Sequence, residues 1–286
     1  MGITLGINQG ALRANRELGK TTGALSDSFA RLSSGKRINK SGDDAAGLAV
    51  ADSLQNSSRL MQVALRNAND GVSAVAVADN ALAQIQSVLQ RQSELAQQAA
   101  NGFFTAEQRS VLQAEFNDLG SEVERIATAT TFNGVALLSG GAAIVLQVGT
   151  DTTSLSQLTI NGLQGTLQQI GLAATGTSAM TYSLSGTTTA ESQSAARSAL
   201  NAIGNAINSV TQRRGSLGVL ETRLQTTINN LAVTRENISA AEGRIRDLDI
   251  AEEAANLTRL TILQQVGAAV SAQANQAPRI ALSLLQ

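Results

Sequence analysis

Both halves of the 286-residue chain carry stretches in which apolar residues recur every three or four positions. In the C-terminal half the series is Ala196, Leu200, Ile203, Ile207 and Val210. In the N-terminal half it is Leu112, Phe116, Leu119, Val123 and Ile126. Helices with this spacing carry one apolar stripe that must be buried against a partner, so we expect the two halves to pack together.

The stretch between these series is almost free of charge, since Asp151 is the only charged residue between Arg125 and Glu191. Alternation of apolar side chains with period two predicts two short strands there. The alternating residues are Ile144, Leu146 and Val148, and then Tyr182 and Leu184. Asn161-Gly162 predicts a hairpin turn, because both residues tolerate positive φ.

Turn and capping signals divide the helical regions. Ser33-Ser34-Gly35 ends a first helix, and Ser41 or Asp43 is expected to cap the next one. No Pro interrupts residues 45–100, which predicts a very long helix. Thr105, with Gln108 three residues later, predicts a capping box at the start of a third helix.

The predicted fold is therefore mainly α: a long antiparallel helical bundle or coiled coil formed by the N- and C-terminal halves, with a small central β-rich subdomain. The expected segments follow this plan in chain order. They are residues 1–44 (terminal helix and connecting loop), 45–132 (first half of a helical rod), 133–189 (β-rich subdomain), 190–240 (second half of the rod) and 241–286 (connecting loop and terminal helix).

Missing residue types restrict the possible functions. The chain has no His and no Cys, so the commonest general base, the thiolate nucleophile and sulfur-based zinc sites are all excluded. We expect no enzymatic activity and no cofactor or metal. A net charge of −1 offers no footprint for nucleic acid, and the apolar windows are too short and mixed to predict membrane insertion. The first residues show no cleaved secretory signal.

Charged pairs and runs are interpreted as structural. Asp43-Asp44 and Glu252-Glu253 are expected in the first turns of helices, where carboxylates complement the helix dipole. The basic run from Lys36 to Lys40 follows no Gly-rich phosphate cradle, so it is expected to be a solvated or subunit-contacting loop.

The stripes leave two alternatives open. They could line the inside of a monomeric bundle, or they could be completed by other copies of the chain. Apolar residues at both termini favour the second alternative, because two isolated helices bury too little surface to be stable. These residues are Leu5, Ile7 and Leu12 at one end and Ile262, Leu263, Val266 and Val270 at the other.

Several motifs, in order and at both ends, closely resemble those of bacterial flagellins. The resemblance covers roughly residues 1–135 and 190–286. The motifs are Arg31-Leu32-Ser33-Ser34-Gly35, Arg37-Ile38-Asn39, Asp43-Asp44-Ala45-Ala46-Gly47, Arg66-Asn67-Ala68-Asn69-Asp70-Gly71, Thr131-Phe132-Asn133-Gly134-Val135, Ile262-Leu263-Gln264-Gln265, Ala272-Gln273-Ala274-Asn275-Gln276 and Leu282-Ser283-Leu284-Leu285.

The resemblance implies a short flagellin without large outer domains, a secreted subunit that self-assembles into the helical flagellar filament for motility. Its terminal segments would fold on assembly into a coiled coil at the filament centre. The implied assembly interface is Leu5, Ile7, Leu12, Leu18, Leu25, Ile262, Leu263, Val266, Val270, Leu282, Leu284 and Leu285. Implied partners are further copies of the chain, the flagellar cap and hook-associated proteins, and the export chaperone and secretion apparatus.

Two alternative functions remain within the resemblance: a hook–filament junction protein, and a flagellin-type protein with another secreted role. A catalytic flagellin is disfavoured, since the chain has no His for a zinc-binding helix and too short a middle for a peptidase domain.

The resemblance also implies innate immune recognition by the flagellin-sensing Toll-like receptor of hosts. The matching residues are Arg91, Leu95 and Glu115, whereas Ser93 and Gln97 depart from residues common in strongly sensed members. The terminal leucines Leu282, Leu284 and Leu285 resemble a segment read by cytosolic inflammasome sensors.

Overall fold

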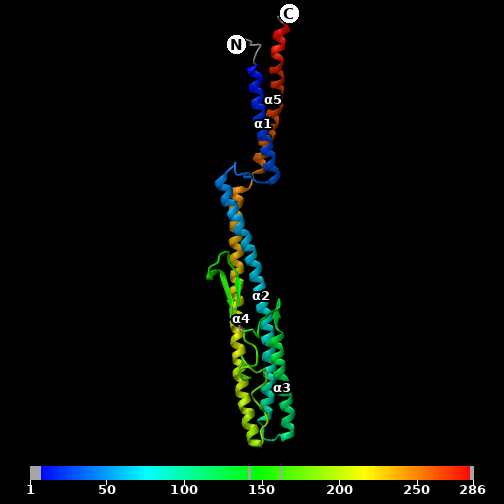
Figure 1. Ribbon diagram of the computed structural model, residues 1–286, viewed down its shortest axis with the longest axis vertical. Helices are drawn as coiled ribbons and strands as arrows, with labels where there is room; N and C mark the ends of the chain where they lie inside the picture. The colour runs from blue at the N-terminus through cyan, green and yellow to red at the C-terminus, as the bar shows by residue number, and fades with distance from the viewer. Residues whose placement is uncertain (1–7, 141–142, 162, 284–286) are drawn as a thin grey trace. The chain divides into compact units, whose positions relative to one another are not determined.

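The structure, a computed structural model, describes residues 8–140, 143–161 and 163–283. In these residues the helices are α1 (Gln9–Ser34), α2 (Ala45–Ala99), α3 (Ala106–Ala129), α4 (Thr189–Arg246) and α5 (Ile250–Ser283). Four short strands and one 3₁₀ turn, η1 (Ser154–Ser156), lie between α3 and α4. The mainly α fold with a small β-containing middle is confirmed (Figure 1).

The chain divides into two compact units, with boundaries that fall inside α2 and α4. The terminal unit consists of residues 1–58 and 236–286, and the central unit consists of residues 59–235. The finer division into five segments stays a prediction.

The central unit is built around α2, α3 and α4, whose apolar stripes meet as expected. Phe116, Val123 and Ile126 on α3 are buried together with Ile203 and Val210 on α4. The remaining stripe residues, Leu112, Leu119, Leu200 and Ile207, pack against this core. Many small side chains at the contacts, such as Ala68, Ala78, Ala96, Ala199 and Ala206, are fully buried and let the helices approach closely.

Cap chemistry fixes the turn between α2 and α3. The predicted capping box is present, since the Thr105 side chain accepts from Gln108 N and the Gln108 side chain accepts from Thr105 N. Arg109, only 1% exposed, donates from Nε to Ala99 O at 3.0 Å and from Nη2 to Asn101 O at 2.7 Å. These bonds satisfy carbonyls at the end of α2 that helix geometry leaves without partners.

Two antiparallel hairpins form the β structure. β1 (Thr131–Phe132) and β2 (Val135–Ala136) are joined by Asn133 and Gly134, whose φ values of 50° and 78° suit a tight hairpin turn. β3 (Ile144–Gln147) pairs with β4 (Gln157–Ile160) in the register Ile144↔Ile160 to Gln147↔Gln157, which confirms the first predicted strand. The predicted turn at Asn161-Gly162 lies partly outside the described residues.

The second predicted strand, at Tyr182 and Leu184, was wrong, because these described residues form no strand. Leu184 is buried in the helical core, and its backbone N–H donates a hydrogen bond to Gln113 Oε1 on α3. The alternation therefore reflects an extended segment held on a helix surface by side chains, which satisfies its backbone without a neighbouring strand.

By length and hydropathy alone, α2 also qualifies as a membrane-crossing helix. Of its most apolar window, however, 39% is buried within the protein. The apolar face of α2 is accounted for by the core, where Leu82, Ile85 and Leu89 are fully buried.

Candidate assembly surface

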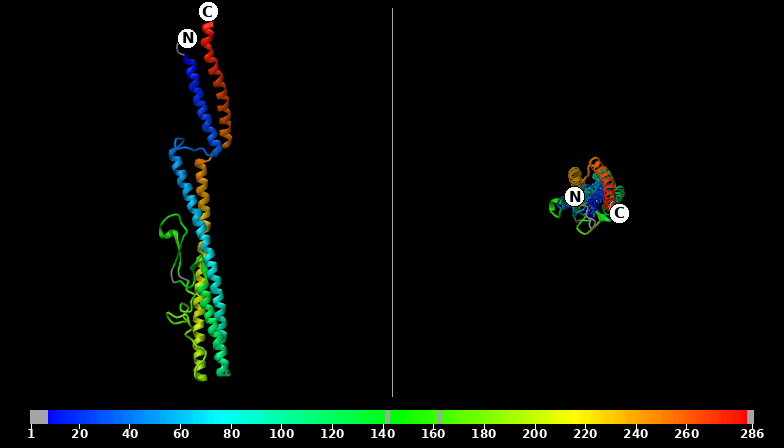
Figure 2. Two further views of the ribbon diagram at one scale, coloured as in Figure 1. Left: turned by 45° about the vertical axis from the view of Figure 1, so that its right-hand side comes forward. Right: turned by 90° about the horizontal axis from the view of Figure 1, so that it is seen from above.

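In the terminal unit, α1 and α5 lie side by side and antiparallel (Figures 1 and 2). The less exposed residues of each helix recur with steps of three and four, so they form a narrow seam. On α1 these residues are Ala11, Ala14, Leu18, Thr21, Leu25, Ser28 and Leu32. On α5 they are Glu253, Leu257, Leu260, Gln264, Gly267, Ser271 and Ala274.

Polar contacts and one glycine set the register of this seam. Asn8 Nδ2 donates to Ala274 O at 2.7 Å, and Ser271 Oγ donates to Asn15 Oδ1 at 2.6 Å. At the other end Ser28 Oγ donates to Glu253. A Cβ added to Gly267 would lie 3.4 Å from Leu18 Cδ1, so the helices are in close contact there. The seam therefore combines leucines with small and polar residues, and it buries only part of the apolar surface of the two helices.

Most of the large apolar residues of the pair therefore lie outside the seam. The exposed fractions on α5 are 55% for Ile262, 45% for Leu263, 51% for Val266 and 52% for Val270. On α1 they are 57% for Leu12 and 55% for Phe29. We call Ile262, Leu263, Val266 and Val270 the α5 apolar row. A groove of about 550 Å³ runs beside it, with Arg13, Glu17 and Leu18 on the α1 side.

The predicted interface residues thus separate into two groups. Leu18 and Leu25 are half-buried within the seam, whereas Leu12 and the α5 apolar row are open to solvent. Leu5, Ile7, Leu284 and Leu285 lie outside the described residues, and the side chain of Leu282 is not described either.

The two connectors that lead into α2 and α5 are hydrogen-bonded to each other. Lys36 and Asp247 form an isolated antiparallel bridge. Arg37 N donates to Arg246 O at 2.7 Å, and Leu248 N donates to Gly35 O at 3.1 Å. Gly35 ends α1 with φ 67°, a left-handed conformation that glycine adopts without strain. The basic run is thus largely a backbone-bonded connector.

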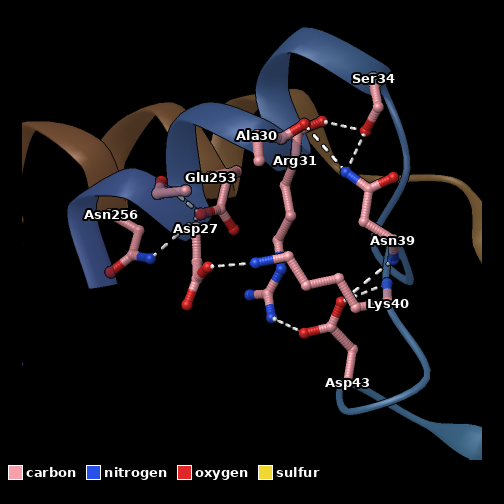
Figure 3. A network of polar contacts seen from close by, with 10 residues as sticks. Asp27, Ala30, Arg31, Ser34, Asn39, Lys40, Asp43, Glu253 and Asn256 are labelled. Atoms are coloured by element: carbon pink, nitrogen blue, oxygen red, sulfur yellow. Dashed lines mark hydrogen bonds and ion pairs between the residues drawn. The ribbon is translucent and has the colours of Figure 1, made fainter. Parts of the chain in front are cut away.

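A polar network holds the connector between α1 and α2 (Figure 3). Asp43 Oδ2 accepts from the backbone N–H groups of Asn39 and Lys40 at 3.1 and 3.0 Å, and Asp43 Oδ1 accepts from Arg31 Nη2 at 3.2 Å. The backbone donors, followed by Arg31, hold the pKa of Asp43 below its usual 3.8. Asn39 Nδ2 donates to Ala30 O at 3.0 Å and to Ser34 Oγ at 2.8 Å.

Glu252 and Glu253 lie in the first turn of α5 as predicted, whereas the expected role of Asp43-Asp44 needs correction, since α2 has no acidic residue in its first turn. Asp44, and not Ser41 or Asp43, accepts from a first-turn amide of α2, Gly47 N, at 2.9 Å. A Cβ on Gly47 would lie 2.3 Å from Asp44 Oδ2, so this capping side chain needs the glycine. At α5 the amides of Ala251 and Glu252 donate to Asp249, whereas Glu253 is turned into the seam. The role of Asp43, which accepts hydrogen bonds from the backbone of Asn39 and Lys40, could not be predicted from helix-capping preferences alone.

The central unit brings together two of the three predicted receptor residues. Arg91 donates from Nε and Nη2 to Glu115 Oε1 at 3.0 and 2.9 Å, and from Nη1 to Glu94 Oε2 at 2.9 Å. Glu94, followed by Glu115, raises the pKa of Arg91. Leu95 lies in the core and is 1% exposed. The geometry therefore presents a charged surface cluster, with Leu95 supporting it from within.

Two residues of the Arg66–Gly71 motif on α2 lie against the β3–β4 hairpin. Asn67 Nδ2 donates to Gln147 O at 2.9 Å. A Cβ on Gly71 would lie 2.4 Å from Leu146 Cδ1, so a side chain at this position would force the Leu146 side chain of the hairpin to move. A glycine inside a long helix is the signal from which this close approach could be inferred.

No group of three or more potential metal-binding side chains occurs within the described part of the chain. The terminal unit presents an exposed apolar surface, formed by Leu12 and the α5 apolar row. Residues 6–143 match the bacterial flagellin N-terminal helical region, and residues 200–285 match the bacterial flagellin C-terminal helical region.

Full-length relatives agree with these matches. A flagellin of Halalkalibacterium halodurans is 37% identical over 279 residues, which cover 98% of each chain. The flagellar filament 33 kDa core protein of Treponema phagedenis is 37% identical over 281 residues, again 98% of each. A solved structure of a putative flagellar hook-associated protein from Vibrio parahaemolyticus has a similar fold, with a TM-score of 0.59 and 15% identity over 72% of this chain and all of that one.

Proposed function

The chain belongs to the bacterial flagellin family, and we propose that this structural subunit of the flagellar filament polymerises through the outward face of its α1–α5 pair. The proposed assembly surface consists of Leu12 and the α5 apolar row. Leu18 and Leu25 support it from the seam. The predicted residues Leu5, Ile7, Leu282, Leu284 and Leu285 would extend it toward the chain ends.

One observation carries this proposal: the α1–α5 pair leaves Leu12, Phe29 and the α5 apolar row exposed, while its seam combines leucines with small and polar residues. The seam includes Ser28, Gln264, Gly267 and Ser271, while the α5 apolar row is about half-exposed. A contiguous exposed apolar patch on a soluble chain marks an interaction site. Because a helix pair with such a thin seam gains little from its own burial, contacts with neighbouring copies would supply the missing stabilisation.

The filament is an extracellular structure, and the similarity to a flagellin and to a flagellar filament core protein supports this location for the chain. We infer further that the chain leaves the cell through the flagellar secretion apparatus with an export chaperone, and meets the flagellar cap and hook-associated proteins outside. We also infer that it works without catalysis, an inference supported by the absence of His and Cys from the sequence.

The hook-associated alternative has less support. Its evidence is a similarity of fold at 15% identity, whereas the sequence relatives at 37% identity are filament proteins. A long helical bundle is common to both classes, so the fold alone does not separate them.

Recognition by the flagellin-sensing Toll-like receptor is a second proposal, and the surface cluster of Arg91, Glu94 and Glu115 favours it. Receptor contact would use the Arg91 and Glu115 side chains, with Leu95 shaping the helix surface beneath them. Replacing Arg91 and Glu115 by Ala should weaken receptor signalling by the purified monomer, and unchanged signalling would count against this role.

The assembly proposal is tested by removing the terminal helices. A chain trimmed before Ala45 and after Arg244 is expected to remain a soluble monomer that no longer forms filaments, whereas the full chain polymerises on seeds. Filaments formed by the trimmed chain at the same concentration, seen by electron microscopy, would refute the proposal.

A further inference from the structure

The chain has few side chains that mild oxidants attack. It contains no Cys, Trp or His, so the thioethers of its three methionines are its only sulfur groups. Met1 lies outside the described residues, and Met61 on α2 is not among the residues that pack against the hydrophobic core. Met180 is partly buried and does pack against this core. Since oxidation turns an apolar thioether into a polar sulfoxide, only Met180 of the two described methionines would lose a core contact.

Met180 fills a space that a glycine leaves open on α3. Gly120 is buried, and a Cβ at this position would lie 2.6 Å from Met180 Cγ and 3.0 Å from Met180 Sδ. The thioether therefore occupies the place where any other residue would put its own side chain. The fully buried Gln92 of α2 borders the same space, because that Cβ would lie 3.5 Å from Gln92 Nε2. We call this space the Gly120 notch.

The segment that carries this thioether has few other attachments to the helices. Before it, Gln169 O accepts from Arg213 Nη2 on α4 at 2.9 Å. After it, Ser183 Oγ donates to Gln113 Oε1 on α3 at 3.1 Å. Between these anchors, no hydrogen bond joins residues 173–182 to a helix in the part of the chain that the structure describes. Apolar packing, that of the thioether included, therefore holds the 173–182 segment in place.

A sulfoxide oxygen would find no free side-chain donor in the Gly120 notch. The donor that borders the notch, Gln92 Nε2, already donates to Phe116 O at 3.0 Å. Turning this amide toward the sulfoxide would break the bond to Phe116, and leaving it in place would bury an unpaired acceptor. Either outcome has the cost of a lost buried hydrogen bond, which shifts the equilibrium toward the undocked segment by about tenfold or more.

We propose that Met180 is a reversible oxidation site whose sulfoxide releases the 173–182 segment from α3. In the forward step hydrogen peroxide transfers one oxygen atom to Sδ. The O–O bond breaks, an S–O bond forms, the sulfur is oxidised by two electrons, and water is the second product. A methionine sulfoxide reductase that uses thiols restores the thioether, with the oxygen leaving as water and two thiols becoming a disulfide. The site lies in the central unit and does not depend on filament assembly.

Hydrogen exchange in the purified full-length chain tests this release. Hydrogen peroxide should add one oxygen to the peptide that contains Met180, as read by mass spectrometry. The amides of residues 173–182 should then exchange about tenfold faster or more, because a released segment opens more often. The Thr181 amide, which donates to Leu172 O at 3.0 Å, reports from within the segment. Treatment with the reductase should restore the slow exchange.

Three variants separate this release from other effects of peroxide. Met180→Leu keeps an apolar side chain of similar volume, so its exchange should stay slow before and after peroxide. Met180→Gln places a polar group in the Gly120 notch, so its exchange should be fast without any oxidant. Met61→Leu should respond to peroxide as the unsubstituted chain does.

The same measurements can overturn the proposal. Peroxide that oxidises Met61 but leaves Met180 intact refutes the oxidation site. Unchanged exchange in a chain with fully oxidised Met180 refutes the release, as does slow exchange in Met180→Gln. A peroxide response that persists in Met180→Leu assigns the effect to another group.

Discussion

Replacing two valines of the α5 apolar row tests how much of the assembly free energy this row provides. Val266 and Val270 are 51% and 52% exposed, so about half of each side chain is still available for burial. Full burial of such a side chain contributes about 1.5–3 kcal/mol, and the remaining half is therefore worth about 1 kcal/mol. The double change Val266→Ser and Val270→Ser should weaken subunit addition by about 2 kcal/mol. Since 1.4 kcal/mol corresponds to a factor of ten, the critical concentration should rise about thirtyfold.

Sedimentation of seeded filaments measures this concentration, because the unpolymerised chain left in the supernatant equals it at equilibrium. The matched control is Val233→Ser on α4, where the same residue type is 57% exposed but lies in the central unit. The control loses a similar partly buried contact within the monomer. A difference in critical concentration between the double variant and the control therefore reports the free energy of subunit addition. Equal critical concentrations for the double variant, the control and the unsubstituted chain would show that the row is not an interface.

Three further outcomes follow from individual side chains. Asp43 has a pKa lowered in the folded chain, so its contribution to connector stability is present above about pH 4 and is lost as pH falls through that lowered value. The protection of the Asn39 and Lys40 amides against hydrogen exchange, measured relative to their intrinsic rates at each pH, should therefore fall in acid, and Asp43→Asn should remove this pH dependence. Phe116→Ala should destabilise the central unit by about 3–5 kcal/mol in urea unfolding, because the ring is fully buried, and a loss below about 1 kcal/mol would contradict the core assignment. Gln92 is fully buried: its Nε2 donates to Phe116 O at 3.0 Å, whereas its Oε1 is unpartnered among the described residues. Gln92→Met removes both this hydrogen bond and the unpaired oxygen, so the unfolding free energy should change by less than about 1 kcal/mol in urea unfolding, and a loss of about 3 kcal/mol would refute this.

Much of the fold could be predicted from local sequence signals. The stripes around Phe116 and Ile203, the capping box at Thr105 and the strand at Ile144 all depend on spacing within a few residues, and the structure confirms them. The Tyr182–Leu184 strand was wrong for the complementary reason. A strand needs a partner, and whether an extended segment pairs with another strand or lies on a helix is decided by distant residues.

Only part of the candidate assembly surface could be predicted from the sequence. Heptad-spaced residues such as Leu18 could be assigned to an interface, but the sequence does not say which of several apolar rows faces the partner helix. The structure places Gly267 and Ser271 in the seam and leaves Val266 outside. Small and polar residues allow a closer approach and satisfy each other across the seam, where they share the contact with leucines such as Leu18 and Leu260.

The sequence by itself determined that this chain is a helical protein of the flagellin family, because periodicity, caps and motif order are local properties that survive without coordinates. Only the tertiary structure decided which apolar side chains remain in water. It also showed that Asp43 organises the connector between α1 and α2. Burial depends on contacts between segments far apart in the chain, and those contacts are fixed by the register of packed helices, which no local pattern specifies.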